Sequence, residues 1–155
     1  MISLVADPKQ WKFVIRVYAI ILNDDKDVLL SDECFMDTQM TKFPGGGLEF
    51  GEGTIDCLKR EAIEEFGQEI EIVRHFYTTD FFQSSLFHDN TQLISIYYIA
   101  QFKGAIKFKI STYPFDFPFK QNGSQAFRWV KIENLTADDL TFPIDKHIVQ
   151  LLKDI

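Results

Sequence analysis

The sequence predicts a mixed α/β fold of the α+β type, in which strands joined mainly as hairpins pack against helices. Runs of β-branched and aromatic residues alternate with turn clusters, and two segments carry apolar residues at helical spacing. The chain has 155 residues, 46% of them hydrophobic, which is enough for one sizeable core. Because it shows no internal repeat and no linker, we expect residues 1–155 to form a single domain.

The chain before the first helix indicates strands and turns. Residues 13–22 are too continuously apolar for a one-sided strand, which predicts a central strand buried on both faces. A turn cluster at 23–27 leads into a second strand at 28–30, and we expect these two strands to form a hairpin. We interpret the ambiguous residues 31–41 as a loop that covers the site. The residues before Lys12 are expected to be a loose lead-in.

The first helix lies within the stretch from Pro44 to Gln68 and carries a dense set of carboxylates. At about 100° per residue its buried stripe is predicted to be Ile55, Leu58, Ala62 and Phe66. Gly67 follows, where a left-handed C-cap is expected. Away from the stripe, Glu61 and Glu65 lie one turn apart. Because like charges at this spacing repel, a bound cation such as Mg²⁺, which takes oxygen ligands, best explains the cluster.

After this helix the sequence predicts two paired strands at 69–78 and 92–102 and a short strand at 127–132. Residues 133–140 indicate a turn of helix, and Pro143 suits the first turn of a last helix. The inner face of that helix is predicted to carry Ile144, Ile148, Leu151, Leu152 and Ile155.

The Pro44–Gln68 stretch resembles the Nudix box, written G-x5-E-x7-R-E-U-x-E-E-x-G-U, where U is a bulky aliphatic residue. The invariant positions are filled by Gly46, Glu52, Arg60, Glu61, Glu64, Glu65 and Gly67. Two softer positions depart, because Ala62 is small and Gln68 is polar. So many fixed positions at fixed spacing make a specific signal, which we prefer to the alternative of a solvated acidic helix face with turn glycines.

The resemblance to the Nudix family implies an α/β/α sandwich around a mixed β-sheet. It also implies Mg²⁺-dependent hydrolysis, with Mn²⁺ possible, of a nucleoside diphosphate linked to another group. The implied metal ligands are Glu61, Glu64, Glu65 and the carbonyl of Gly45. Arg60 would orient a glutamate, and Glu52 would support the metal shell or orient the loop. Glu64 or Glu65 is the candidate general base within the box.

Several residues outside the box are weaker candidates. The loop at 80–90 carries Phe81, Phe82 and Phe87, which could stack on a base, although packing at the sheet edge or a dimer contact is the simpler interpretation. The family often places a late glutamate before its last strand, but Gln125 or Ser124 occupies that neighbourhood here. Lys42 could contact phosphate, yet a lysine at a strand end is usually just solvated.

Composition limits the partners that we expect. A net charge of −7 argues against a stable nucleic acid complex, but a bound metal ion can still attract a small nucleotide-type substrate. Cys34 and Cys57 have neither zinc spacing nor a disulfide framework, so we expect buried, reduced thiols. No signal peptide or membrane span is predicted, which favours a cytoplasmic protein. We expect a monomer or a homodimer.

Three functions remain open at this point. The intact box favours a pyrophosphohydrolase acting on a nucleoside triphosphate or a sugar nucleotide. The alternatives are a non-catalytic nucleotide-ligand sensor and an enzyme like isopentenyl diphosphate isomerase, which shares the Nudix fold. The isomerase reaction needs a catalytic cysteine, and neither cysteine of this chain is convincingly placed for that role.

Overall fold

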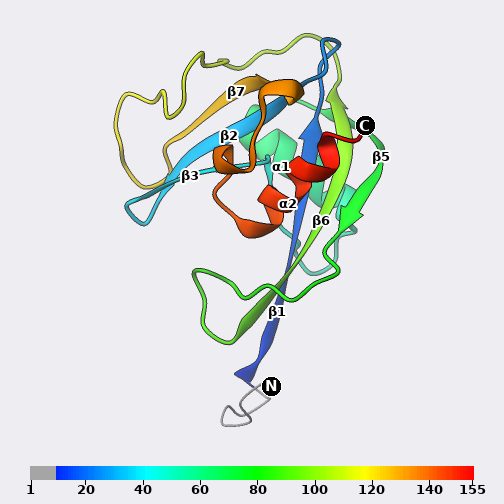
Figure 1. The fold of residues 1–155 in the computed structure, drawn as a ribbon, viewed down its shortest axis with the longest axis vertical. Helices are drawn as coiled ribbons and strands as arrows, with labels where there is room; N and C mark the ends of the chain where they lie inside the picture. Colours follow the sequence, from blue (N-terminus) through cyan, green and yellow to red (C-terminus); the bar gives the residue numbers. More distant parts are fainter. Residues whose placement is uncertain (1–9) are drawn as a thin grey trace.

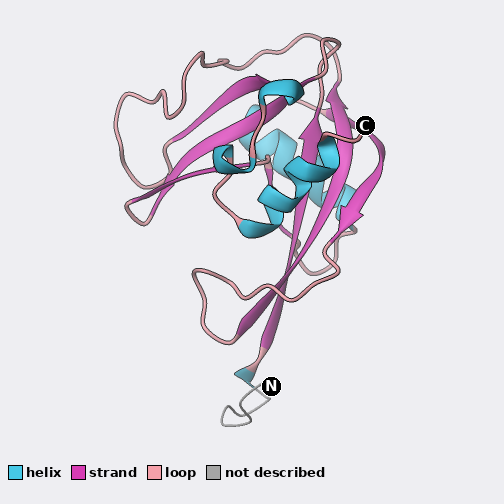
Figure 2. Ribbon diagram, viewed as in Figure 1, coloured by secondary structure: helices cyan, strands magenta, loops and turns pink. Residues whose placement is uncertain are grey.

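The computed structural model describes residues 10–155, whose strands form two sheets (Figures 1 and 2). The strands are β1 (Lys12–Ile21), β2 (Asp27–Phe35), β3 (Thr38–Lys42), β4 (Gly45–Gly47), β5 (Ile70–Thr78), β6 (Thr91–Phe102) and β7 (Gln125–Lys131). The helices are α1 (Thr54–Phe66) and α2 (Pro143–Leu152), with 3-10 turns η2 (Ile132–Asn134) and η3 (Ala137–Asp139). The sheet orders are β4-β1-β6-β5 and β3-β2-β7. The loose lead-in expected before Lys12 lies almost wholly outside the described residues.

The central strand β1 separates the two apolar clusters of the core. It pairs in parallel with β6 along its whole length and antiparallel with the short β4. Tyr18 and Ile20 pack in the cluster that contains α2, whereas Val17 and Ala19 pack in the cluster that contains α1. Because side chains alternate along a strand, the helices cover opposite faces of the sheet, as Figure 2 shows. The predicted α/β/α arrangement around a mixed sheet is confirmed.

The second sheet corrects two expectations. Apart from one bridge between Leu22 and Val28, β1 does not pair with β2, so the hairpin prediction was wrong. Strand β2 leaves β1 and pairs antiparallel with β3 and β7 instead. Residues 31–41 are largely strand rather than a loop, because their polar side chains have buried partners. Asp32, for example, accepts hydrogen bonds from Thr41 at 2.6 Å and from Arg128 at 2.7 Å.

Helix α1 follows its predicted pattern except in the first turn. Ile55 is 41% exposed, and its place on the buried face is taken by Cys57. The small thiol lets α1 approach β4, where Sγ donates to the Gly47 carbonyl at 3.6 Å. At the other end Gly67 is left-handed as predicted, with φ of +63°, and its N–H donates to the Ile63 carbonyl.

The remaining elements are close to their predicted bounds. The strands expected at 69–78 and 92–102 pair antiparallel as β5 and β6, and α2 begins at Pro143. Ile155 is 59% exposed, contrary to its prediction, because α2 ends at Leu152. In residues 10–155 no helix has the length and apolar character needed to cross a membrane. Both cysteines are buried and unbridged, as expected.

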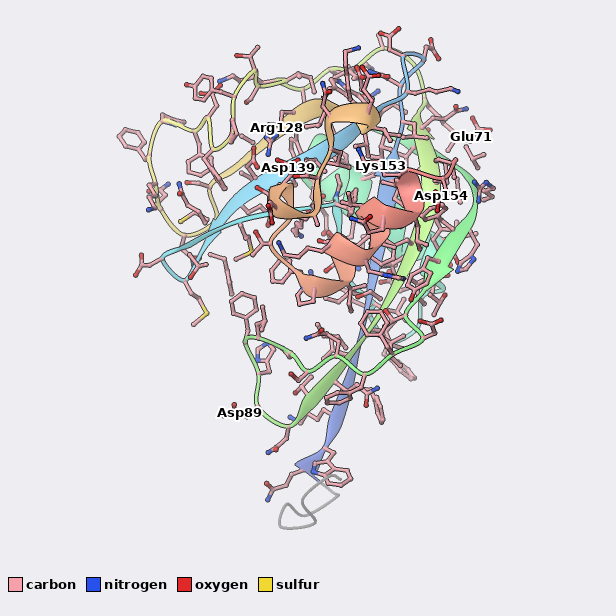
Figure 3. All side chains as sticks on the ribbon, viewed as in Figure 1. Glu71, Asp89, Arg128, Asp139, Lys153 and Asp154 are labelled. Atoms are coloured by element: carbon pink, nitrogen blue, oxygen red, sulfur yellow. The ribbon has the colours of Figure 1, made fainter. Side chains whose placement is uncertain are left out.

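Figure 1 shows that β1 and β6 run side by side past the rest of the fold toward the N-terminus. The loop between β5 and β6, drawn in green, lies beside this extension, and Figure 3 places Asp89 near its tip. The β2–β3 hairpin and the start of α2 lie above this loop in the view of Figure 1. Residues of these elements line the cavity described below.

Candidate functional site

The acidic cluster consists of Glu52, Glu61, Glu64 and Glu65, and Arg60 on α1 binds the first three. Its Nε and Nη2 donate to the two carboxylate oxygens of Glu52 at 2.9 and 2.7 Å. Its Nη1 donates to Glu61 at 3.1 Å and to Glu64 at 3.2 Å, while Nη2 also reaches the Gly47 carbonyl at 3.1 Å. The hydrogen bonds from Arg60 lower the pKa of Glu52 to about 2. The guanidinium therefore holds three box glutamates together and connects them to the glycine turn.

The glycine turn, formed by Gly45, Gly46 and Gly47, fits closely against α1. A Cβ added at Gly46 would lie 2.2 Å from Oε1 of Glu61, so any side chain there would displace this carboxylate. Gly45 adopts φ of +150°, and a Cβ at this position would lie 2.1 Å from the carbonyl oxygen of Val17. Glycine is therefore required at position 45 for the approach of β1, whereas at position 46 it leaves room for the carboxylate of Glu61.

Glu65 lies deeper than the other box glutamates. Burial raises its pKa to about 7, and nearby Glu33 and Glu61 act in the same direction. Its Oε1 accepts a long hydrogen bond from Gln125 at 3.4 Å. Its Oε2 is buried and has no hydrogen-bond partner within residues 10–155. A buried carboxylate oxygen without a donor is costly, and a bound cation would remove that cost.

A polar chain connects Glu65 to the glycine turn. The amide of Gln125 also donates to Ser31 Oγ at 3.0 Å, and Ser31 donates to Glu33 at 2.8 Å. Glu33 forms a 3.2 Å ion pair with Lys42, whose ammonium also donates to the Gly45 carbonyl at 3.3 Å. Lys42 is buried, so the interpretation of this lysine as simply solvated was wrong.

The oxygen donors of the site fit a hard divalent cation. Glu61, Glu64 and Glu65 each keep an oxygen that Arg60 does not bind, and the Gly45 carbonyl lies nearby on β4. Carboxylate and carbonyl oxygens suit Mg²⁺ or Mn²⁺. In the part of the chain that the structure describes, no three acidic, histidine or cysteine side chains converge on one point. Arg60 draws Glu61 and Glu64 toward itself in this arrangement.

A cavity of about 310 Å³ opens on the α2 face of the sheet. Its floor contains the rings of Tyr18 and Tyr97, which stack with centroids 5.2 Å apart. The wall residues come from β1, β6, the β2–β3 hairpin, the 79–90 loop and the start of α2. The charged residues among them are Arg16, Glu33, Lys42 and Asp145. Since Glu33 and Lys42 also belong to the polar chain, the cavity adjoins the acidic cluster.

Asp145 is the buried acid of this cavity. Its Oδ1 accepts a hydrogen bond from the hydroxyl of Tyr97 at 2.6 Å. Its Oδ2 is buried, and no donor within the described residues reaches it. Burial raises the pKa of Asp145 to about 6. Asp145 therefore contributes a buried carboxylate, bound by Tyr97, to the lining of the cavity.

The three candidate phenylalanines lie in different places. Phe87 lines the cavity, with its ring edge-on to Phe35 at 5.5 Å and to Phe142 at 6.2 Å. Phe82 lines a second hollow near the start of β1, and Phe81 packs edge-on to His147 at 5.6 Å. Only Phe87 of these three shares a cavity with Tyr18 and Asp145.

Sequence reasoning missed Arg16, Glu33 and Asp145. Glu33 was hidden by the interpretation of its segment as a loop. The other two had a usable signal, because each is a charged residue inside an apolar pattern. Arg16 interrupts the continuous apolar run of β1, and Asp145 lies between Ile144 and Ile148 on the buried face of α2. A charge at such a position needs either a partner or a function.

The sequence profile of the NUDIX domain matches residues 12–152. The chain belongs to the Nudix hydrolase family. The match spans both sheets and both helices, so the acidic cluster and the cavity lie within one Nudix domain. No curated protein matches the chain in sequence.

Solved structures share the Nudix fold with this chain at low sequence identity. The solution structure of the E. coli ORF135 protein aligns with a TM-score of 0.70 at 19% identity, covering 96% of this chain and 94% of that one. A MutT protein from Methanosarcina mazei Go1 aligns with a TM-score of 0.65 at 17% identity, covering 94% of this chain and 96% of that one. An ADP-ribose pyrophosphatase from Streptococcus suis 89-1591 aligns with a TM-score of 0.56 at 17% identity, covering 90% of this chain and 87% of that one.

Proposed function

We propose that this Nudix protein hydrolyses a pyrophosphate bond in a nucleoside diphosphate linked to another group, with a nucleoside triphosphate or a sugar nucleotide as substrate. The observation that carries the proposal is the buried, unpartnered Oε2 of Glu65 beside the carboxylates gathered by Arg60. The cavity next to this cluster can hold the nucleoside part of such a substrate. A cytoplasmic enzyme, monomeric or homodimeric and consisting of one domain over residues 1–155, is part of the same proposal.

Each side chain of the cluster receives a role from its contacts. Glu61, Glu64, Glu65 and the Gly45 carbonyl would hold Mg²⁺ or Mn²⁺, which neutralises the diphosphate and activates water when bound. Arg60 orients Glu61 and Glu64, and Glu52 fixes Arg60 through a two-point contact. Gln125, in the neighbourhood where the family often has a glutamate, steadies Glu65 through Oε1.

The reaction transfers one proton and breaks one P–O bond. Water attacks phosphorus and forms a new P–O bond, while a carboxylate accepts its proton. The P–O bond to the bridging oxygen breaks, and this oxygen leaves as part of a phosphate ester or, from a triphosphate, of pyrophosphate. Glu64 and Glu65 are the two candidate bases. Glu64 is exposed and paired with Arg60, whereas Glu65 is partly buried and has a raised pKa. A pH–rate profile that loses its acidic limb in one variant only, Glu64→Gln or Glu65→Gln, identifies the base.

The proposal is tested with a panel of nucleoside triphosphates, sugar nucleotides and dinucleotides, each with and without Mg²⁺. Wild type is compared with Glu65→Gln and with Glu71→Gln, a matched change on β5 at the far edge of the sheet (Figure 3). We expect Mg²⁺-dependent turnover of one substrate class, lost in Glu65→Gln and kept in Glu71→Gln. Tight ligand binding by folded wild type without turnover would favour a sensor instead.

A further inference from the structure

Arg16 differs from Lys42, the other cation of the cavity, because Glu33 and Glu61 act on its charge only at a distance, without a hydrogen bond or an ion pair. Its Nε donates to the hydroxyl of Tyr18 at 2.7 Å. Neither Nη1 nor Nη2 has a hydrogen-bond acceptor within residues 10–155, and no carboxylate in that range forms an ion pair with Arg16. Lys42, in contrast, is already bound to Glu33 and to the Gly45 carbonyl.

The position of Arg16 connects the cavity with the acidic cluster. It shares one face of β1 with Tyr18 and lines the cavity beside it. On its other side, Nη1 lies 3.9 Å from the point where a Cβ on Gly47 would be. The carbonyl of this glycine binds Arg60. Arg16 therefore lies between the space for a nucleoside and the carboxylates proposed to hold the cation.

The same cavity contains an acid that also lacks a full set of partners. Tyr18 binds Arg16, Tyr97 binds Asp145, and the two tyrosine rings stack on one another. Arg16 and Asp145 do not form an ion pair, although both line the cavity. Asp145 is buried, so the group of the cavity that lacks a partner and calls for an anionic ligand is Arg16.

We propose that the free Nη groups of Arg16 bind the phosphate that stays with the nucleoside after hydrolysis. A planar guanidinium with two parallel N–H donors matches two phosphate oxygens. The hydrogen bond from Nε to Tyr18 fixes the plane of this guanidinium. Arg16 thereby sets the direction of the substrate, with the nucleoside in the cavity and the bond to be cleaved at the acidic cluster. This inference rests on the proposed function but assigns a residue outside the Nudix box.

The first test measures binding without metal and without turnover. The probes are adenosine, guanosine, cytidine and uridine 5′-monophosphates and the four matching nucleosides, titrated calorimetrically into wild type, Arg16→Gln and Arg16→Lys. We expect wild type to bind at least one monophosphate about tenfold or more tightly than its nucleoside, because the contact is a charge-assisted hydrogen bond. Arg16→Gln should lose this preference while keeping nucleoside affinity, and Arg16→Lys should keep part of it.

The matched control is Arg74→Gln. Arg74 lies on β5, outside the cavity, where its guanidinium packs over the ring of Phe76. This variant should keep the wild-type preference for the monophosphate. The proposal is overturned if wild type shows no preference for any monophosphate, or if Arg16→Gln retains the preference in full.

A second measurement observes the Arg16 contact in wild type itself. In ¹⁵N-labelled wild type, the Nε–H resonance of Arg16 should shift when a monophosphate is added and stay in place when the matching nucleoside is added. The resonance can be assigned with Tyr18→Phe, which removes the acceptor of this N–H. A resonance that does not respond to any of the four monophosphates overturns the proposal.

Kinetics separate this inference from the proposed function. On a substrate that wild type hydrolyses, Arg16→Gln should raise KM about tenfold or more and leave kcat nearly unchanged, because the contact is made equally in ground and transition states. An unchanged KM, or a loss confined to kcat, overturns the role of Arg16 and leaves the hydrolase standing. If wild type hydrolyses nothing but binds a monophosphate through Arg16, the role of Arg16 is supported and the proposed hydrolase activity is refuted.

Discussion

The guanidinium of Arg60 holds the carboxylate of Glu52 through two nearly parallel hydrogen bonds, at 2.9 and 2.7 Å, although Glu52 precedes the helix that carries Arg60. This pairing anchors the loop between β4 and α1 to the second turn of α1. It also leaves Nη1 free to reach Glu61 and Glu64. The shape of one side chain therefore sets the arrangement of three carboxylates.

Arg60→Lys is expected to disrupt this arrangement while keeping the charge. A lysine ammonium is a single point donor and cannot bind both oxygens of Glu52 together with Glu61 and the Gly47 carbonyl. We expect a lower melting temperature and a loss of hydrolytic activity of about tenfold or more. Arg74→Lys on β5 is the matched control. Equal melting temperature and activity in both variants would contradict the role given to the guanidinium fork.

Gly46→Ala is expected to displace Glu61. The new Cβ would lie 2.2 Å from Oε1, so the carboxylate must move away from Arg60 and from the cation that it would hold. We expect weaker Mn²⁺ binding, measured by electron paramagnetic resonance, and a lower melting temperature. Gly47→Ala provides the comparison, because the nearest atom to its Cβ is 3.9 Å away. If both variants bind Mn²⁺ alike, the close approach at Gly46 has no bearing on the ion.

Asp145→Asn is expected to stabilise the protein at neutral pH and above. Asp145 has a folded-state pKa of about 6, above its ordinary 3.8, so the folded state binds this proton more tightly than the unfolded state. The resulting stability is present below pH 3.8 and is lost as the pH rises through 6. Asparagine cannot ionise, so the variant avoids a loss on the order of 1 to 3 kcal/mol.

The effect of Asp145→Asn is measured by urea unfolding at pH 4 and pH 8. The difference between variant and wild type isolates this residue, because Glu65 titrates in both proteins. Asp154→Asn is the control, since Asp154 is exposed after α2 near the C-terminus (Figure 3). A stability difference that is the same at both pH values would refute the raised pKa.

Glu65→Gln is expected to remove the response to divalent ions. An ion that binds only the folded protein raises its melting temperature in proportion to binding. Mn²⁺ should therefore stabilise wild type and should stabilise Glu65→Gln much less, because the amide offers no charge for the ion. In metal-free buffer at pH 8, Glu65→Gln should have the higher melting temperature, since wild type then bears the cost of a partly buried charge. Identical Mn²⁺ responses would exclude Glu65 as a ligand.

Gln68→Leu restores the aliphatic residue that is usual at the end of a Nudix box, and we expect it to destabilise this chain. The Gln68 amide donates to the carbonyls of Lys103 and Ala105 and accepts from the N–H of Lys107. Leucine would leave these backbone groups unpaired, at a cost of about 1 to 3 kcal/mol. Urea unfolding checks the change, with the exposed Gln101→Leu as control. Unchanged stability would mean that water replaces the amide.

The part of the site that lies on α1 could be predicted from the sequence because its geometry is local. Helical spacing alone places Glu61, Glu64 and Glu65 on adjacent faces, and the glycines mark the turn before them. The exposed Ile55 shows the limit of that reasoning. Periodicity gives the direction of a side chain, but it does not say where along the helix the neighbouring elements begin to cover it.

The cavity could not be predicted because its residues meet through long-range pairing. Arg16 and Tyr18 lie on β1, Tyr97 on β6 and Asp145 on α2, and no sequence period connects them. Their meeting depends on the parallel pairing of β1 with β6. A hairpin of neighbouring strands was the natural expectation, yet β2 joins another sheet and brings Glu33 to the site.

The two apolar clusters on either side of β1 support different parts of the site. Helix α1 is seated on one cluster, and the cavity is built over the other. Val14 and Leu93 line the cavity and do not belong to the cluster that contains α1. Mutations can therefore reshape the pocket without disturbing the acidic helix. Such a division makes the domain readily evolvable, because new substrate preferences can arise while the reacting centre is conserved.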